Sequence, residues 1–313
     1  MIFDENSLKD LKEIVETKDL DAADKFLKQV QREKKRKIFI RSALMVSAHQ
    51  IKHMNKLDSL KADIAIINLE DGVSKELKPV ALKMAAVFLS NIKKSDSMLV
   101  VRVNSLDKGG IEEIEYLNRF KPDAIRIPKV KDVHDVKRAL RTVDENIDIH
   151  LSIETKEAFL NLEHLKIDKR VKVFYLGILD LLSDLEIFQE ILKISNPTID
   201  YILSRFLIIC KSIGVYPVSF VYQDYEKLQE FEEWCIYEKS MGFNAKGCIS
   251  PKQVEIANRI FSPSIEIIEK AKYIKEIFEK MKKIGITGFK DEKYGFIDEP
   301  IYKDALNILK NIQ

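Results

Sequence analysis

Two acidic residues lie at the ends of short apolar runs of the kind that forms a buried strand: Glu154 ends one run, and Asp180 follows the next. Carboxylates at the ends of adjacent strands can share one hard divalent cation, and Mg²⁺ commonly takes only one or two protein carboxylates beside water and substrate oxygens. Such an ion polarises a carbonyl group or holds an enolate. We therefore predict a magnesium site at Glu154 and Asp180. The alternative is that Lys129 or Arg102 forms salt bridges with both carboxylates.

Arg102 is the most informative charged residue within a run, because Val100, Val101 and Val103 surround it. A guanidinium buried without an anionic partner costs several kcal/mol. We expect it to hold a substrate carboxylate or a neighbouring Glu in a bidentate pair. Other polar residues at the ends of runs are Asn68, Glu70, Asp71, Asn104, Arg126, Lys129 and Ser250. Any one of these could instead be a loop residue or a helix cap, and this alternative applies best to Asp71, Ser74, Thr155 and Ser183.

The elements that must position these residues are eight apolar runs separated by amphipathic segments of helical period. Runs of this kind with helices between them predict a parallel sheet, and eight strands close a (β/α)₈ barrel, in which all C-terminal strand ends open onto one rim. An open doubly wound sheet is the alternative, but no GxGxxG follows the first run. The runs are 38–44, 64–69, 98–104, 124–129, 149–154, 171–178, 216–222 and 246–250.

The chain divides into three parts by pattern. Residues 1–36 show helical spacing and no strand-like run, which predicts a helical N-terminal extension. Residues 37–261 form the predicted α/β barrel. Residues 262–313 are strongly helical but contain Gly285, Gly288 and Gly295, and they exceed what the barrel needs. We predict that this segment is a C-terminal helical lid or subunit contact.

The composition is that of an ordinary soluble globular protein. The 313 residues are 46% hydrophobic and 33% charged, and 52 basic against 50 acidic residues leave a formal charge of +2. This balance argues against nucleic-acid binding, which usually needs a clustered positive excess. The basic run 31–37 is interpreted as a solvated helix end or linker; the alternative is an anion-binding or membrane-surface patch. No apolar run could span a membrane and no signal peptide is evident, so we expect a cytoplasmic protein.

Cysteines and histidines add little chemistry. Cys210, Cys235 and Cys248 are odd in number, with no CxxC pair, so neither a disulfide framework nor structural zinc is expected. We interpret Cys248 as a small core residue, because no adjacent histidine could activate it. His49 and His53 lie four residues apart, a spacing that can bind metal, but no third ligand is evident.

Taken together, the segments resemble the citrate lyase β-subunit-like branch of the HpcH/HpaI aldolase superfamily. They occur in the order of that family, and their agreement as a set is more specific than any one of them. The matching segments are RSALMVSA (41–48), IINLEDGVSKELKPVA (66–81), VVRVNSLD (100–107), PDAIRIPKV (122–130), IETKEAFLN (153–161), LGILDLLSDL (176–185), GFNAKGCISPKQVEIANRIFSPS (242–264) and GFIDEP (295–300).

The resemblance implies a (β/α)₈ barrel, commonly trimeric or hexameric, that uses Mg²⁺ to cleave or form a carbon–carbon bond between an acyl thioester and a 2-oxo acid. It implies that Glu154 and Asp180 are the metal ligands and that Arg102 binds the substrate carboxylate. It implies that Arg41 and Gly177 also bind substrate and that Glu70 and Lys129 act with Arg102 as catalytic residues of the same pocket. Some members take a catalytic aspartate from the C-terminal segment of a neighbouring subunit, and Asp298 is the matching residue here.

Four positions depart from the family pattern. Asn68 and Ser47 replace the usual Asp and Pro, Lys131 replaces an acidic residue, and Ser250 replaces a His. The exchanges at 68 and 131 make the pocket more positive, and the N-terminal helices are not typical of the family.

Three functions therefore remain open. The first is a Mg²⁺-dependent lyase or aldolase acting on a small hydroxy acid or on an oxo acid of the oxaloacetate, glyoxylate or pyruvate type, with a CoA thioester, a carrier-protein thioester or a free acid as the second component. The second is an acyl-CoA thioesterase that uses the same metal site. The third is a catalytically weakened barrel that serves as a binding or assembly subunit. Thermal shifts with Mg²⁺ and an oxo acid separate a working metal site from the third function.

Overall fold

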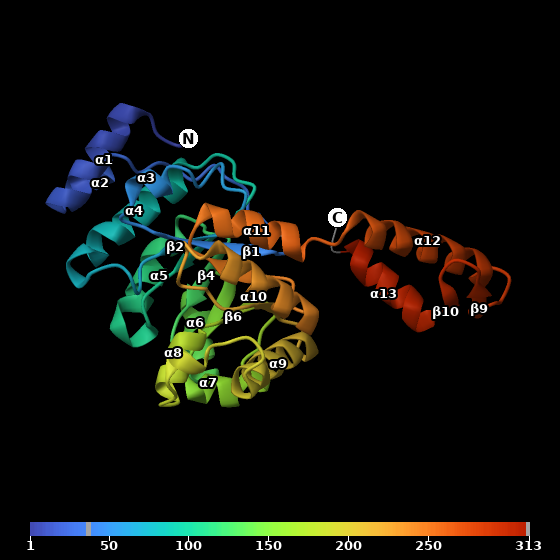
Figure 1. Ribbon diagram of the computed structural model, residues 1–313. Coiled ribbons are helices and arrows are strands. Elements are labelled where there is room, and N and C mark those ends of the chain that lie inside the picture. The colour runs from blue at the N-terminus through green and yellow to red at the C-terminus, as the bar shows by residue number, and fades with distance from the viewer. Residues whose placement is uncertain (36–38, 311–313) are drawn as a thin grey trace.

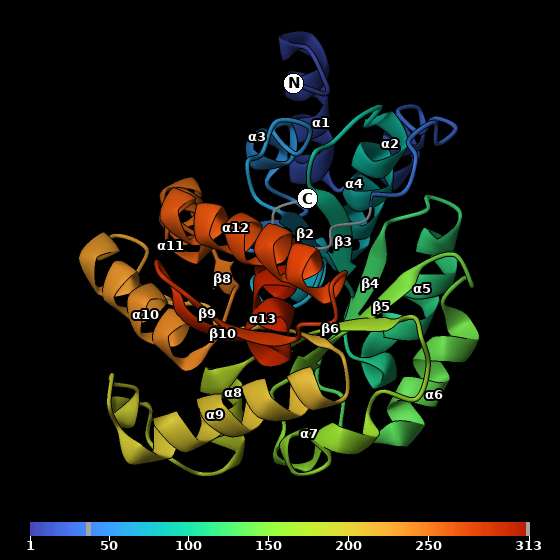
Figure 2. The same ribbon diagram turned by 90° about the vertical axis from the view of Figure 1, so that its right-hand side faces the viewer.

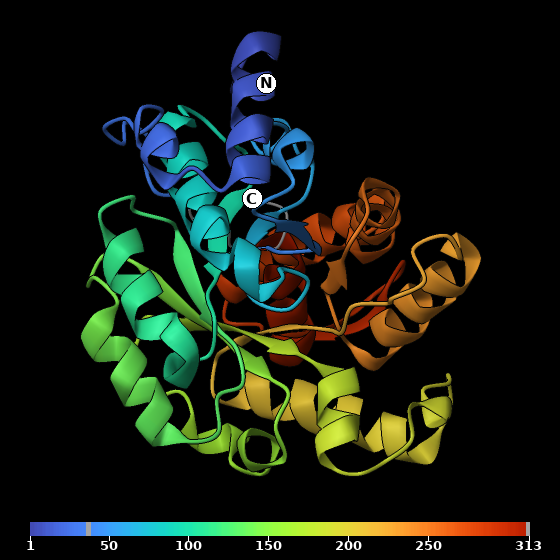
Figure 3. The same cartoon turned by 90° about the vertical axis from the view of Figure 1, so that its left-hand side faces the viewer.

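The computed structural model describes residues 1–35 and 39–310, and its centre is an eight-stranded parallel sheet in the order β7-β6-β5-β4-β3-β2-β1-β8. A parallel bridge between Ser219, just after β7, and Lys246 of β8 brings the two edges together. Helices surround the strands in Figure 3. The predicted (β/α)₈ barrel is confirmed. The strands are β1 Ser42–Ser47, β2 Ile64–Asn68, β3 Met98–Arg102, β4 Ala124–Ile127, β5 Asp148–Ile153, β6 Val171–Leu176, β7 Tyr216–Val218 and β8 Lys246–Cys248.

The strands are apolar on both faces, as a parallel sheet covered by helices requires. Alternate residues such as Ile66, Val100 and Ala124 form a small core inside the barrel, whereas Ile125 and Leu151 belong to the larger core under the helices. The helices around the barrel are α3 Ile51–Met54, α4 Lys78–Asn91, α5 Ile111–Asn118, α6 Val133–Thr142, α7 Lys156–Leu160, α8 Ile178–Asp184, α9 Pro197–Ser212, α10 Leu228–Met241 and α11 Pro251–Phe261.

The first strand differs from its prediction. It was expected at 38–44, but it begins at Ser42 and ends at Ser47, because its partners are available only from there: Ser42 pairs with Lys246 of β8 and Ala43 with Ile64 of β2. Residue 38 and the expected domain boundary between 36 and 37 lie outside the described residues.

The N-terminal extension contains two helices, α1 Glu5–Thr17 and α2 Leu20–Asp24, and no helix in residues 25–35. Phe3, before α1, packs edge-on against Phe88 of α4 at 5.2 Å between ring centroids. Arg32 forms a buried ion pair with Asp123, which directly precedes β4. The extension therefore packs on α4 and then passes the N-terminal ends of the strands.

The C-terminal segment forms a separate small core beside the barrel. It consists of α12 Ile265–Lys282, a hairpin of β9 Gly288–Asp291 and β10 Gly295–Asp298, and α13 Glu299–Lys310. Figure 1 shows it projecting from the barrel, and Figure 2 shows it in front of one end. Asn307 and Lys310 border a cavity with Ile40, Met98 and Tyr216, so this end carries the N-terminal ends of the strands. The core residues of the segment are Ala271, Ile274, Phe278, Ile297 and Ala305.

The C-terminal segment was predicted to be helical. Its two helices agree with this prediction, but the hairpin between them was not predicted. No helix in the described residues is long and apolar enough to cross a membrane.

Candidate active site

A cavity of about 330 Å³ opens at the C-terminal ends of the strands, where the sequence placed the chemistry. It brings together four predicted residues from three strand ends: Arg102, Glu154, Gly177 and Asp180. In a (β/α)₈ barrel this rim carries the active site. The full lining is Met45, Asp71, Gly72, Arg102, Arg126, Glu154, Leu176, Gly177, Ile178, Leu179, Asp180, Phe220, Val221, Gln223 and Ile249.

One side of the rim is a closed cluster of ion pairs. Arg102 Nη2 contacts Glu70 Oε2, and Lys129 Nζ lies 2.8 Å from Glu70 Oε1. Asp71 Oδ2 lies 3.3 Å from Lys129 Nζ and 3.6 Å from Arg102 Nη2. Burial alone would raise the pKa of Glu70, but Arg102, Lys129 and the Asp71 amide outweigh it and lower the pKa to about 2. Two cations and two carboxylates thus compensate one another, and Arg102 has the Glu partner that was one of its two predicted partners.

Backbone conformation directs these groups. Lys129 has a positive φ of 51°, and its N–H donates a hydrogen bond of 2.7 Å to Glu154 Oε1. The turn after Glu70 and Asp71 requires Gly72, whose φ of 89° is rarely adopted by other residues. Gly177 has a different role, since a Cβ there would lie 2.6 Å from Glu154 Cβ and 2.7 Å from its Oε2. The absent side chain leaves room for the Glu154 carboxylate.

Glu154 and Asp180 differ from the cluster, because neither forms an ion pair with a Lys or Arg in the described part of the chain. Burial raises the pKa of Glu154, and the nearby Asp180 charge raises it further, against opposing effects of Arg102 and Arg126. The salt-bridge alternative is therefore wrong for this structure, since Arg102 and Lys129 pair with Glu70 and Asp71 instead. Two carboxylates that border one cavity, one of them buried and carrying the hydrogen bond from Lys129, form an oxygen donor set that fits a hard divalent cation.

Arg126 lines the cavity but was not among the predicted site residues. Its Nε donates to Ser152 Oγ at 2.8 Å, and its guanidinium carbon lies 4.0 Å from the centroid of the Tyr175 ring. Tyr175 in turn hydrogen-bonds His150 Nδ1 at 3.0 Å. The sequence did contain a signal for Arg126, since it is a charged residue inside an apolar run, as Arg102 is. Phe220, Val221 and Ile249 also line the cavity, but apolar residues in apolar runs give no sign of a site.

Two predicted site residues lie elsewhere. Arg41 precedes β1 at the opposite end of the barrel, where its Nε and Nη2 donate to Asp63 and its Nη1 to Ser262. The expectation that Arg41 lies at the pocket is corrected, because β1 starts after it rather than before it. Asp298 ends β10 in the C-terminal segment, outside the cavity lining, and accepts a hydrogen bond from the Ile301 amide at 3.2 Å.

The four departures from the family pattern have local structural roles or lie exposed. Asn68 donates to the Asp71 carbonyl at 2.5 Å and so holds the loop after β2. Ser250 caps α11 through the Gln253 amide. The side chain of Lys131 is exposed, and Ser47 pairs with Asn68 in the sheet.

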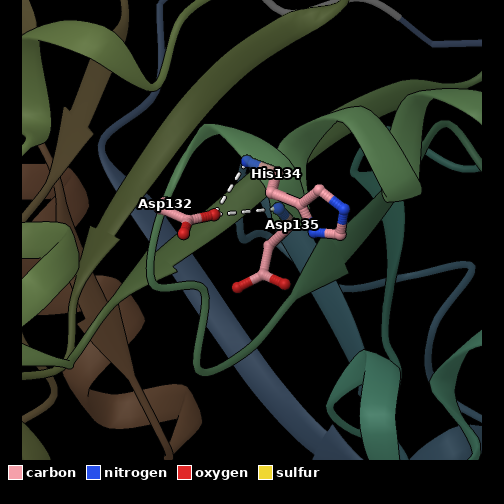
Figure 4. Close-up of side chains that lie close together, drawn as sticks. All are labelled: Asp132, His134 and Asp135. Atoms are coloured by element: carbon pink, nitrogen blue, oxygen red, sulfur yellow. Dashed lines mark hydrogen bonds between the residues drawn. The ribbon is translucent and has the colours of Figure 1, made fainter.

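A second group of potential metal ligands, Asp132, His134 and Asp135, lies at the start of α6 (Figure 4). Asp132 accepts hydrogen bonds from the amides of His134 and Asp135, and Asp135 pairs with Arg138 at 3.5 Å. These contacts explain the group as a helix cap.

The cysteines Cys210, Cys235 and Cys248 are all buried free thiols, and burial raises the pKa of Cys248 to about 12. This is the inert core position that the sequence predicted for Cys248.

Comparison with known proteins gives the family. The model of the HpcH/HpaI aldolase/citrate lyase family matches residues 41–251. The chain belongs to this family. The family match spans the strands from β1 to β8 and every residue that lines the cavity, so the predicted resemblance is confirmed.

Relatives within the HpcH/HpaI family carry different activities in their names. A (3S)-malyl-CoA thioesterase of Cereibacter sphaeroides is 28% identical, over 78% of this chain and 85% of the relative. The human mitochondrial citramalyl-CoA lyase is 27% identical, over 85% of this chain and 84% of its own. The citrate lyase subunit beta of Escherichia coli is 23% identical, over 80% of this chain and 86% of the relative.

Solved structures share the fold. A citrate lyase from Burkholderia xenovorans has a TM-score of 0.73 at 18% identity, covering 89% of this chain and 93% of its own. The CitE protein of Mycobacterium tuberculosis, in complex with magnesium, acetoacetate and coenzyme A, has a TM-score of 0.68 at 17% identity. The match covers 88% of this chain and 99% of the CitE chain.

Proposed function

We propose that this protein is a Mg²⁺-dependent carbon–carbon lyase that cleaves or forms a bond between a 2-oxo acid and an acyl thioester unit. The observation that carries the proposal is the pair Glu154 and Asp180, two carboxylates without a cationic partner among the described residues, in a cavity whose other acidic side chain, Asp71, is paired. The names of the human and E. coli relatives, both lyases, support the reaction type.

Glu154 and Asp180 would hold the metal. When bound there, Mg²⁺ supplies a Lewis acid for the carbonyl oxygen whose charge changes as the carbon–carbon bond breaks. Gly177 keeps the Glu154 carboxylate in place by leaving space beside it. The Lys129 amide adds a hydrogen bond to the same carboxylate.

Arg102 lines the cavity together with Glu154, and Glu70 and Lys129 belong to its ion-pair cluster without lining the cavity themselves. Glu70 fixes the Arg102 guanidinium, and Lys129, which is partly exposed, pairs with Glu70 and with Asp71 of the cavity lining. We propose that Arg102, held by this cluster, stabilises negative charge on the departing enolate, which must then be protonated. In atom balance, the bond between the two fragments breaks, the carbinol oxygen becomes the oxo group as its proton leaves, and the α-carbon of the thioester takes up one proton.

The proton donor is proposed to come from a second copy of the chain. Asp298 lies in the C-terminal segment, which stands at the end of the barrel opposite the cavity, so only a neighbouring subunit could bring it there. Large apolar side chains exposed on this segment, including Ile265, Ile284 and Phe296, support a subunit contact. We propose a homo-oligomer, trimeric or hexameric, in the cytoplasm, where free thiols such as those of this chain persist.

A thermal-shift experiment tests the metal site. With Mg²⁺ and an oxo acid present, the melting temperature of the wild-type chain should rise, because ligands that bind only the folded state stabilise it. Glu154→Gln and Asp180→Asn should abolish the rise. A wild-type chain that shows no shift with pyruvate, glyoxylate or oxaloacetate would favour the function of a weakened barrel in binding or assembly.

A thioesterase is the second candidate, and the name of the C. sphaeroides relative is the observation that favours it. Hydrolysis would transfer water to the thioester carbonyl and release a thiol. Product analysis separates the two reactions: a lyase acting on a 3-hydroxyacyl thioester yields an oxo acid and leaves a shorter thioester, whereas a thioesterase yields free thiol and the intact hydroxy acid.

A further inference from the structure

Arg126 is a buried cation at the inner end of the candidate active site. It lies on β4, is 5% exposed, and belongs to the lining of the cavity. Its Nε is occupied by Ser152 Oγ at 2.8 Å, and the face of the guanidinium lies over Tyr175. The two Nη groups form no hydrogen bond within the described residues and are not fully buried, so they are the donors that remain for a ligand.

Its lack of an anionic partner sets Arg126 apart. The other deeply buried arginines are paired: Arg102 with Glu70, and Arg32 with Asp123. Within residues 1–35 and 39–310, no carboxylate lies within ion-pair distance of Arg126; the charges of Glu154 and Glu70 act on it from further away, and the positive charge of Arg102 opposes them. Tyr175, His150 and Ser152, which surround it, are uncharged at neutral pH, since burial lowers the pKa of His150 to about 3. A buried charge without a partner is costly, so an anionic ligand is the natural complement.

The charges of the site can be matched group by group. Glu70 and Asp71 are compensated by Arg102 and Lys129. With the metal of the proposed function bound, the two positive charges of Mg²⁺ compensate Glu154 and Asp180. Once the metal compensates Glu154, whose charge otherwise acts on Arg126, Arg126 is the cation of the site that has no ion-pair partner among the described residues, and a single carboxylate would neutralise it.

We propose that Arg126 binds the carboxylate of the 2-oxo acid at the inner end of the cavity, and that the site selects a 2-oxo acid with one carboxylate over a dicarboxylate. Pyruvate and glyoxylate are of the selected kind, and oxaloacetate is of the rejected kind. This inference rests on the proposed function, because the charge matching includes Mg²⁺. It also transfers the carboxylate contact from Arg102, whose guanidinium Glu70 already holds, to Arg126.

The test is calorimetric titration of the full chain with Mg²⁺ present. The ligand pair 2-oxobutyrate and freshly dissolved oxaloacetate isolates charge, because they differ by a methyl group in place of a carboxylate. The wild-type chain should bind 2-oxobutyrate and pyruvate more tightly than oxaloacetate. Arg126→Met should raise the dissociation constant for pyruvate roughly 10- to 150-fold, the range for losing a hydrogen bond to a charged group.

Three controls make the result specific. Arg126→Lys keeps the charge and should recover part of the pyruvate affinity. Arg259→Met, the same exchange at an exposed ion pair on α11, should change nothing. Methyl pyruvate, which lacks the charge, should bind wild type and Arg126→Met with dissociation constants that differ far less than those for pyruvate, a readout that a merely structural role of Arg126 would not produce.

Folding can be checked without ligand. Because Arg126→Met removes an unpaired buried charge, its melting temperature should be no lower than that of the wild type. Should it nevertheless fold poorly, the Arg126→Lys titration decides in its place.

Unchanged pyruvate affinity in a folded Arg126→Met chain, or tighter wild-type binding of oxaloacetate than of 2-oxobutyrate, would overturn this inference alone. A wild-type chain that binds no oxo acid with Mg²⁺ would overturn the proposed function and this inference together.

Discussion

Gly177 tests how the Glu154 carboxylate is positioned, because the site needs a glycine there only to leave space for that side chain. Its φ is not in the left-handed region, so alanine meets no backbone strain there. The added Cβ would lie 2.6 Å from Glu154 Cβ and 2.7 Å from Glu154 Oε2, both far inside contact distance. The Glu154 side chain must therefore move away from the position from which it faces Asp180.

Two quantities should change in Gly177→Ala. Overpacking of this kind costs about 1–3 kcal/mol in the free energy of unfolding. Displacing the groups that orient a metal ligand typically lowers metal affinity roughly 10- to 100-fold. Thermal denaturation without metal measures the first quantity, and titration with Mg²⁺ in the presence of pyruvate measures the second.

Gly288→Ala is the matched control. Gly288 also lacks a positive φ, and a Cβ there would meet only the end of the Phe296 ring at 3.3 Å, in the C-terminal segment. It should leave Mg²⁺ binding unchanged. Wild-type metal affinity and stability in Gly177→Ala would refute the reasoning that Glu154 is held at the metal position by the missing side chain.

Three further predictions concern separate parts of the chain. Arg41→Met should lower the free energy of unfolding by about 1–3 kcal/mol, since it removes the ion pair and the side-chain hydrogen bonds that Arg41 gives to buried Asp63, yet it should keep oxo-acid affinity. A stable Arg41→Met chain that loses oxo-acid affinity would contradict the placement of Arg41 outside the site. The pKa of Glu70 is lowered from 4.5 to about 2, so its stabilisation is complete above pH 4.5 and is lost as the pH falls towards 2. Lys129→Met should move that acid-induced loss to higher pH in denaturant titrations, and an unchanged pH profile would contradict the pairing. Asp298→Asn and Glu154→Gln should each be inactive alone but regain activity when mixed and reassembled; no regain would exclude a shared site.

The fold was predictable because its signal is local. Eight Ile- and Val-rich runs separated by helical patterns can form little other than a covered parallel sheet. The start of β1 was not predictable in the same way, because its pairing with Ile64 and Lys246 depends on the rest of the barrel. A shift of a few residues matters, since each strand residue advances about 3.3 Å. This shift explains why Arg41 lies at the wrong end for the predicted role.

The site was predictable in position but not in its partnerships. Parallel strands bring their C-terminal ends together, so charged residues there had to share a rim. Which acid pairs with which base depends on side-chain directions, and so the sequence left Arg102 with two candidate partners. The hairpin of the C-terminal segment also escaped prediction, because β9 and β10 are short and mostly exposed, and their sequences carry no clear apolar alternation.

The central claim is that Glu154 and Asp180 share one metal ion that a 2-oxo acid completes. A crystal structure of the chain with Mg²⁺ and pyruvate measures it most directly. We predict one ion with an oxygen of Glu154 and an oxygen of Asp180 each at about 2.1 Å, and pyruvate oxygens among the other ligands. An ion bound elsewhere, or the two carboxylates too far apart to share one, would contradict the claim.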